Sequence, residues 1–178
     1  RPKNKLTPLY DEKDAEIAIS QIRCYDFDKE IIIDDNTFIT FKRSGHMLGA
    51  STIHITYKDE YKQKTIAFSG DNSGFNSNRP FLPIADELGK IDYCVIEGTY
   101  GNKTHEKINV QEILRKSIEE PCIQNRKTLL IPSFALQRSS EILWLLREVY
   151  MENPHFNKIP IHLDSPMAIK AQDVINNN

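Results

Sequence analysis

The sequence is poor in cysteine and has no long apolar run, and each shortage excludes a class of protein. Its three cysteines, Cys24, Cys94 and Cys122, are widely separated and form no C-x-x-C pair. Neither a disulfide framework nor a cysteine-based zinc site is therefore expected, and we expect the three thiols to be buried as small apolar groups. No apolar run approaches the roughly 20 residues of a membrane helix, and no signal-peptide core follows the first residues. These absences predict a cytoplasmic protein without a membrane segment.

A strong charge of one sign is also absent. The net charge is -2 and the pI is about 6.2, so any contact with nucleic acid must be local to a groove. With 178 residues, 39% of them hydrophobic, the chain is long enough for one core or two small ones. It lacks a starting Met and ends on three asparagines, which indicates an internal piece of a longer chain.

Hydrophobic periodicity predicts an α/β fold in two parts. Asp11 can cap a first helix, and a β-rich stretch follows, with a hairpin at residues 31–41 and strands near 53–57, 64–68 and 93–96. Helices and strands then alternate, with helices at residues 110–118 and 142–149 and strands at 128–131 and 159–163. The first part is expected to be largely antiparallel and the second to form parallel βαβ units. The domain change is expected near residue 105.

A histidine between two glycines is the first candidate for chemistry. His46 lies in SGHMLGA, residues 44–50, in a turn between two expected strands. Glycines allow the backbone to turn tightly and present the imidazole at a sheet edge, which suits a metal ligand. Taken alone, this pattern is more often a turn whose glycines serve only the bend.

Two acidic residues follow expected strands. Asp71 ends the run FSGD, and Glu97 follows the apolar strand YCVI. A carboxylate at the position of Asp71 can bridge two zinc ions, whereas Glu97 can be a ligand, a partner that orients a histidine, or a proton relay. The alternative for both is an ordinary turn carboxylate. If the strands are neighbours, we expect His46, Asp71 and Glu97 to meet at one edge of the sheet.

Two further motifs lead from expected strands into helices. IPSFALQR contains Ser133 and Arg138, and HLDSPMA contains Ser165. Free backbone N–H groups at a helix start can bind a phosphate, and Arg138 can add a bidentate contact. Capping of the helices by Ser133 and Ser165 explains the same residues equally well.

Taken together and in this order, the motifs resemble the β-CASP nucleases of the metallo-β-lactamase superfamily. The resemblance implies that residues 1–105 are the C-terminal part of the metallo-β-lactamase αββα sandwich and that residues 106–178 begin the inserted β-CASP α/β domain. His46 would then ligate one zinc ion and Asp71 would bridge two. Glu97 would pair with a histidine that protonates the leaving oxygen. Gly98 stands where the family usually has serine.

The implied activity is zinc-dependent hydrolysis of RNA, with Asp71 and Glu97 as catalytic residues and Ser133, Arg138 and Ser165 as substrate contacts. The H-x-H-x-D-H cluster and two later histidines of the family are absent, and no two of the five histidines here have H-x-H spacing. We therefore expect two zinc ions in the parent protein, but partial or no zinc and no activity in this chain alone.

Other interpretations stay open at this point. RNA is the expected partner, single-stranded DNA is an alternative substrate, and the chain can form a homodimer or serve as a complex subunit. A non-catalytic β-CASP scaffold would also fit, as would a small-molecule metallo-hydrolase of the same superfamily. The β-CASP-like segments from Thr128 onward argue against the small-molecule enzyme.

Overall fold

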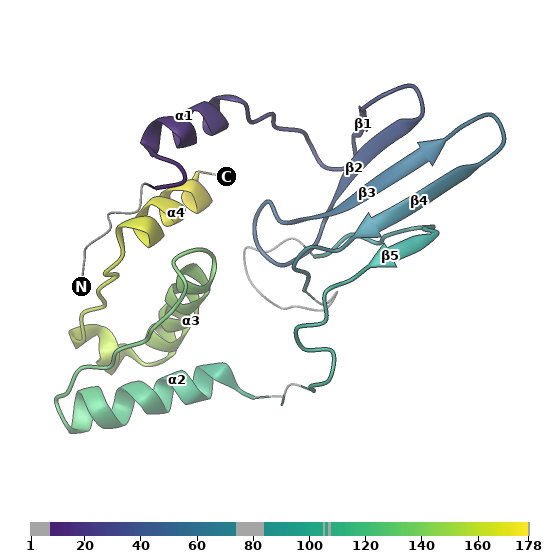
Figure 1. Cartoon of the computed structure of the whole chain (residues 1–178). Helices are drawn as coiled ribbons and strands as arrows, with labels where there is room; N and C mark the ends of the chain where they lie inside the picture. The colour runs from purple at the N-terminus through teal and green to yellow at the C-terminus, as the bar shows by residue number, and fades with distance from the viewer. Residues whose placement is uncertain (1–7, 74–83, 105, 107, 178) are drawn as a thin grey trace, which may run out of the picture.

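A computed structural model describes residues 8–73, 84–104, 106 and 108–177. The fold is mixed α/β, as predicted, with the strands gathered on one side and α2, α3 and α4 on the other (Figure 1). Chain order gives the elements α1 (Glu12–Ser20), β1 (Glu30–Ile32), β2 (Thr37–Arg43), β3 (Ser51–Lys58), β4 (Gln63–Phe68), β5 (Tyr93–Val95), α2 (Val110–Ile118), the π-helix η1 (Glu119–Gln124), α3 (Arg138–Glu152), the 3-10 helix η2 (Pro154–Lys158) and α4 (Pro166–Asn176). None of the helices in the described residues is long and apolar enough to cross a membrane.

The five strands form one sheet in the order β1-β2-β3-β4-β5. The first three pairings are antiparallel and β4 pairs with β5 in parallel, which confirms the expected antiparallel character of this half. Because β4 and β5 run in the same direction, the residues that follow them leave the sheet at the same edge. The turn between β2 and β3 lies at that edge too, since Ile53 at the start of β3 pairs with Phe68 at the end of β4.

The two faces of the sheet differ in an unexpected way. Its buried positions are mostly polar or small, namely Thr52, His54, Thr65, Ala67 and Ser69. The opposite face carries two apolar rows that cross four strands in register, Ile39-Ile55-Ile66-Tyr93 and Phe41-Ile53-Phe68-Val95. These apolar side chains are half-buried or exposed. A sheet usually buries its apolar face against another layer, and no element of the described residues buries this one.

The helical part has a core of its own. Ile118, Leu146, Val149 and Phe156 are its buried residues, and they come from α2, α3 and η2. The helix expected at residues 110–118 is α2, but the chain stays helical beyond it, through Pro121, as η1. Proline lacks an N–H and its ring clashes with the carbonyl four residues earlier, so the helix widens instead of ending.

The expected strands at residues 128–131 and 159–163 are wrong. Both segments contain no assigned strand, and no ladder pairs them. Two short strands rarely pair stably without a third strand or a covering layer. The predicted burial of the cysteines is also wrong, because Cys24 and Cys94 are exposed and Cys122 is half-buried.

Candidate metal centre

The loop that carries His46 joins β2 to β3. The N–H of Ser44 donates to the carbonyl of Ala50 at 3.1 Å and closes the loop. Gly45 has φ +71°, and a Cβ there would lie 3.0 Å from the backbone nitrogen of Ala85. A side chain at this position would be strained by the positive φ and would press on Ala85, so glycine suits the position next to His46.

The aspartate lies beside this loop. Nε2 of His46 is 3.8 Å from Oδ2 of Asp71, and their side chains are 43% and 75% exposed. This separation is too long for a direct hydrogen bond. Both groups are open to solvent and face each other from neighbouring loops, an arrangement that two ligands of one ion require.

Glu97 completes the group from the end of β5. Its Oε1 accepts the N–H of Asn72 at 3.0 Å, and its Oε2 accepts the hydroxyl of Thr99 at 2.6 Å. These bonds, that of Thr99 first, lower the pKa of Glu97, and the charge of nearby His46 lowers it further. Glu97 is therefore ionised at neutral pH, and the three predicted residues meet at one edge of the sheet.

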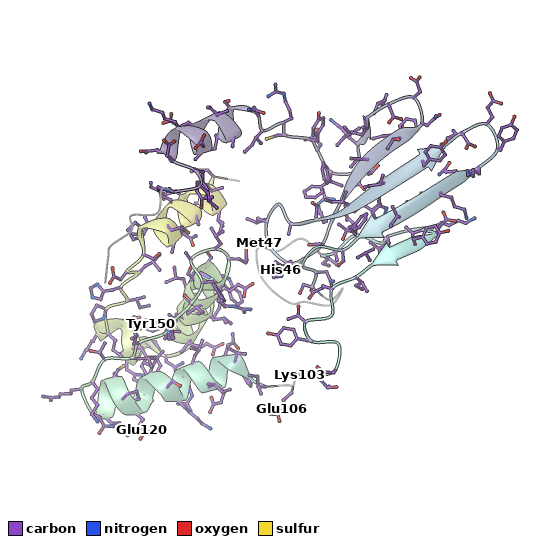
Figure 2. All side chains as sticks on the ribbon, viewed as in Figure 1. His46, Met47, Lys103, Glu106, Glu120 and Tyr150 are labelled. Carbon is purple, nitrogen blue, oxygen red and sulfur yellow. The ribbon has the colours of Figure 1, made fainter. Side chains whose placement is uncertain are left out.

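His46 and Met47 lie at the end of the sheet where the β2–β3 loop turns (Figure 2). The described residues contain no group of three or more His, Cys, Asp or Glu side chains that could hold a metal ion. His46 and Asp71 are thus a pair of candidate ligands, and a complete site would need ligands from outside the described residues.

The three residues predicted to contact substrate do not lie in one place. Ser133 and Ser165 line one cavity of about 660 Å³, between residues 127–135 and 159–165. Arg138 is not among its lining residues and instead donates to Glu141 at 2.8 Å. His46, Asp71 and Glu97 do not line this cavity either.

The two serines also differ as helix caps. The hydroxyl of Ser165 accepts the N–H of Ala168 at 3.2 Å and caps α4. Capping by Ser133 is wrong, because α3 begins later, at Arg138, with Gln137 as its N-cap. The segment between Ser133 and Gln137 turns before the helix starts, so the serine hydroxyl is too early in the chain to reach the first turn.

Sequence reasoning missed the serines that support the candidate ligands. Ser44 and Ser69 are both buried, and each stands two residues before a candidate ligand. The signal was present in the sequence, because the dipeptide Ser-Gly precedes both His46 and Asp71. Both glycines, Gly45 and Gly70, adopt positive φ.

Relatives with curated names match nearly the whole chain. An RNase J-like protein of Methanocaldococcus jannaschii is 32% identical over 91% of this chain and 38% of its own length. Cleavage and polyadenylation specificity factor 73 of Drosophila melanogaster is 32% identical over 93% of this chain and 23% of its own length. A ribonuclease of Thermus thermophilus is 28% identical over 90% of this chain and 35% of its own length.

The chain is a relative of the β-CASP nucleases. The resemblance predicted from the motifs is therefore confirmed. No protein-family model matches the chain. The chain spans less than two fifths of the length of the three relatives named above.

Proposed function

We propose that this chain is part of a zinc-dependent ribonuclease that hydrolyses phosphodiester bonds in RNA. The observation that carries the proposal is the placement of His46 beside Asp71, 3.8 Å apart, at the sheet edge where Glu97 also emerges. The names of the relatives, an RNase J-like protein and a ribonuclease among them, support RNA as the substrate. Single-stranded DNA is the alternative that the test below includes.

The two candidate ligands fit zinc in kind and in spacing. Imidazole nitrogen and carboxylate oxygen are both ordinary zinc ligands, and two of them on one tetrahedral ion lie about 3.4 Å apart. The observed 3.8 Å separation is close to this value, so a small movement of either exposed side chain would suffice. Zinc in such a site supplies Lewis-acid polarisation of a phosphoryl oxygen and activation of water.

The remaining roles belong to the residues of the chain itself. His46 and Asp71 would hold zinc, with Asp71 bridging two ions in the parent protein. Glu97 keeps the loop of Asp71 in place through Asn72 and would pair with a histidine that serves as the acid. Ser133, Arg138 and Ser165 would contact the RNA backbone, although Arg138 would first have to leave Glu141.

The proposed organisation follows the same resemblance. Residues 1–105 would complete a metallo-β-lactamase sandwich, and residues 106–178 would begin a β-CASP domain. The packing supports a division here, because the strands contact one another and α2, η1, α3, η2 and α4 contact one another. As an isolated piece, the chain would hold no stable zinc pair and would not cleave RNA, since zinc usually needs three or four protein ligands.

The test uses the full-length protein that carries this chain. Asp71→Asn should abolish cleavage of RNA and lower the zinc content, whereas Asp35→Asn, an exposed aspartate in the β1–β2 turn, should change neither. Parallel assays with single-stranded DNA distinguish the two nucleic acids. A full-length protein that binds RNA without zinc and without cleavage would contradict the proposal and indicate a scaffold subunit instead.

A further inference from the structure

Ser44 is almost completely buried, with 2% of its surface exposed, and each of its polar groups is used. Its N–H donates to Ala50 across the His46 loop at 3.1 Å, and its carbonyl accepts the N–H of Ser73 at 3.0 Å. Its hydroxyl donates to the carbonyl of Asp71 at 2.8 Å. One residue therefore ties together the two loops that carry the candidate ligands.

The hydrogen bonds of Ser44 with Asp71 and Ser73 also restrict the orientation of the main chain between those two residues. They bind the chain on both sides of Asn72, so the peptide that follows Asp71 cannot rotate freely. The N–H of Asn72 is held as well, by Glu97. The main chain of residues 71–73 is thus fixed at successive points, and Ser44 supplies two of them.

The link from Ser44 to His46 is also short. Only Gly45 separates Ser44 from His46, and Gly45 lies so close to Ala85 that a Cβ on it would come within 3.0 Å of the Ala85 nitrogen. Arg43, on the other side of Ser44, is also anchored, because its N–H donates to Asp86 at 2.6 Å and its carbonyl accepts the N–H of Asp86 at 2.9 Å. A substitution at Ser44 would consequently change the positions of both Asp71 and His46.

We propose that Ser44 is a positioning residue that sets the separation of the His46 imidazole and the Asp71 carboxylate through its hydroxyl. The inference rests on the proposed function, because the pair is assigned there as zinc ligands. Ser44 itself would contact neither zinc nor RNA. Groups that orient ligands in this way typically change metal affinity about 10-fold to 100-fold when they are removed.

The experiment compares Ser44→Ala with Ser139→Ala in the full-length protein. Ser139 is a matched control, since it is 4% exposed and its hydroxyl donates to the carbonyl of Ala135 at 2.7 Å. Both variants lose one buried hydrogen bond, so a similar fall in the thermal midpoint is expected. Zinc affinity, measured by competition with a chromophoric chelator, should fall about 10-fold or more for Ser44→Ala only.

A second readout does not depend on zinc. In the metal-free protein, amide hydrogen exchange in residues 45–50 and 71–73 should speed up together in Ser44→Ala and stay unchanged in Ser139→Ala. Unchanged exchange, or equal losses of zinc affinity in the two variants, would overturn the inference. A wild-type protein that binds no zinc would instead overturn the proposed function, and exchange would still decide whether Ser44 couples the loops.

Discussion

The main-chain N–H of Asn72 donates to Oε1 of Glu97 at 3.0 Å, so the acidic residue after β5 holds the loop after β4. The same carboxylate accepts the hydroxyl of Thr99 through Oε2. Oε2 also accepts the main-chain N–H of Thr99 at 3.4 Å. The Thr99 hydroxyl can donate or accept, but the two main-chain N–H groups only donate, so this position suits a carboxylate better than an amide, whose NH₂ group can only donate.

Glu97→Gln is therefore expected to loosen the loop of Asp71. Glutamine can keep its oxygen toward Asn72, but its NH₂ group would then face the main-chain N–H of Thr99, and the bond from Asn72 would lose its charged acceptor. We expect the exchange of the Asn72 amide hydrogen to rise about 10-fold, because its hydrogen bond would lose a charged acceptor. Glu87→Gln, an exposed glutamate elsewhere in the same half of the chain, should leave that exchange rate as in the wild type.

Gln137 is held in a conformation that glutamine rarely adopts. Its φ and ψ are 59° and -55°, and the N–H of Arg138 donates to the carbonyl of Leu136 at 2.6 Å, which together define a strained γ-turn. The side chain is buried, and its Nε2 has no hydrogen-bond partner within the described residues. Such backbone strain costs of order 1 to 3 kcal/mol.

Replacing Gln137 with glycine and with alanine separates the strain from the loss of the side chain. At ordinary positions alanine is more stable than glycine by roughly 0.5–1 kcal/mol. At Gln137 we expect the reverse, with glycine more stable by about 1 kcal/mol, because only glycine adopts this φ without strain. Urea unfolding of the two variants measures the difference, and an alanine variant as stable as the glycine variant would show that the turn is not strained.

His54 should make the stability of the sheet depend on pH. It is 6% exposed in β3, between Thr40 and Ala67, and its Nε2 lacks a hydrogen-bond partner in the described part of the chain. Burial lowers the pKa of His54, and the charge of Lys42 lowers it further. The folded protein therefore favours the neutral ring.

The sign of the effect follows from linkage. In the unfolded chain His54 takes up a proton near pH 6.5, whereas the folded chain resists it until lower pH. The free energy of unfolding should consequently fall as the pH drops below about 6.5, and this fall should be smaller in His54→Leu. His162→Leu, which replaces an exposed histidine, should keep the slope of the wild type in urea titrations at successive pH values.

The local patterns predicted local structure well. Asp11 caps α1 through its side chain, and the N–H of Asp11 donates to the carboxylate of Asp14 at 2.9 Å, the reciprocal arrangement that acidic residues at these positions favour. The strands were also visible, because alternation and turn residues are properties of a few adjacent residues. The meeting of His46, Asp71 and Glu97 followed from strand order, which a single sheet restricts strongly.

Features that depend on distant partners were not predictable. Residues 128–131 have the composition of a strand but lack a pairing partner in the described structure, and composition carries no information about partners. The support from Ser44 was missed for the same reason, since its hydroxyl bonds to a residue 27 positions away. The burial of the polar face of the sheet likewise depends on the segment that packs against it, which local sequence patterns do not reveal.

The open apolar face of the sheet leads to the last prediction, for the 178-residue chain in isolation. Two rows of four side chains at ordinary strand spacings cover on the order of 250 Å², and a sheet normally buries such an apolar face against another layer, which a second copy of the chain can supply. Ile55 lies inside this grid, between Ile39 and Ile66. Ile55→Lys should therefore shift the chain toward monomer in sedimentation velocity measurements.

The control for this variant is Tyr61→Lys. Tyr61 is 90% exposed in the hairpin between β3 and β4, so this substitution adds the same charge and removes a large side chain away from the grid. It should leave the association unchanged, because an isolated exposed aromatic buries little surface on contact. If both variants become monomeric to the same extent, then net charge rather than the apolar face controls the association, and the sheet surface has no part in it.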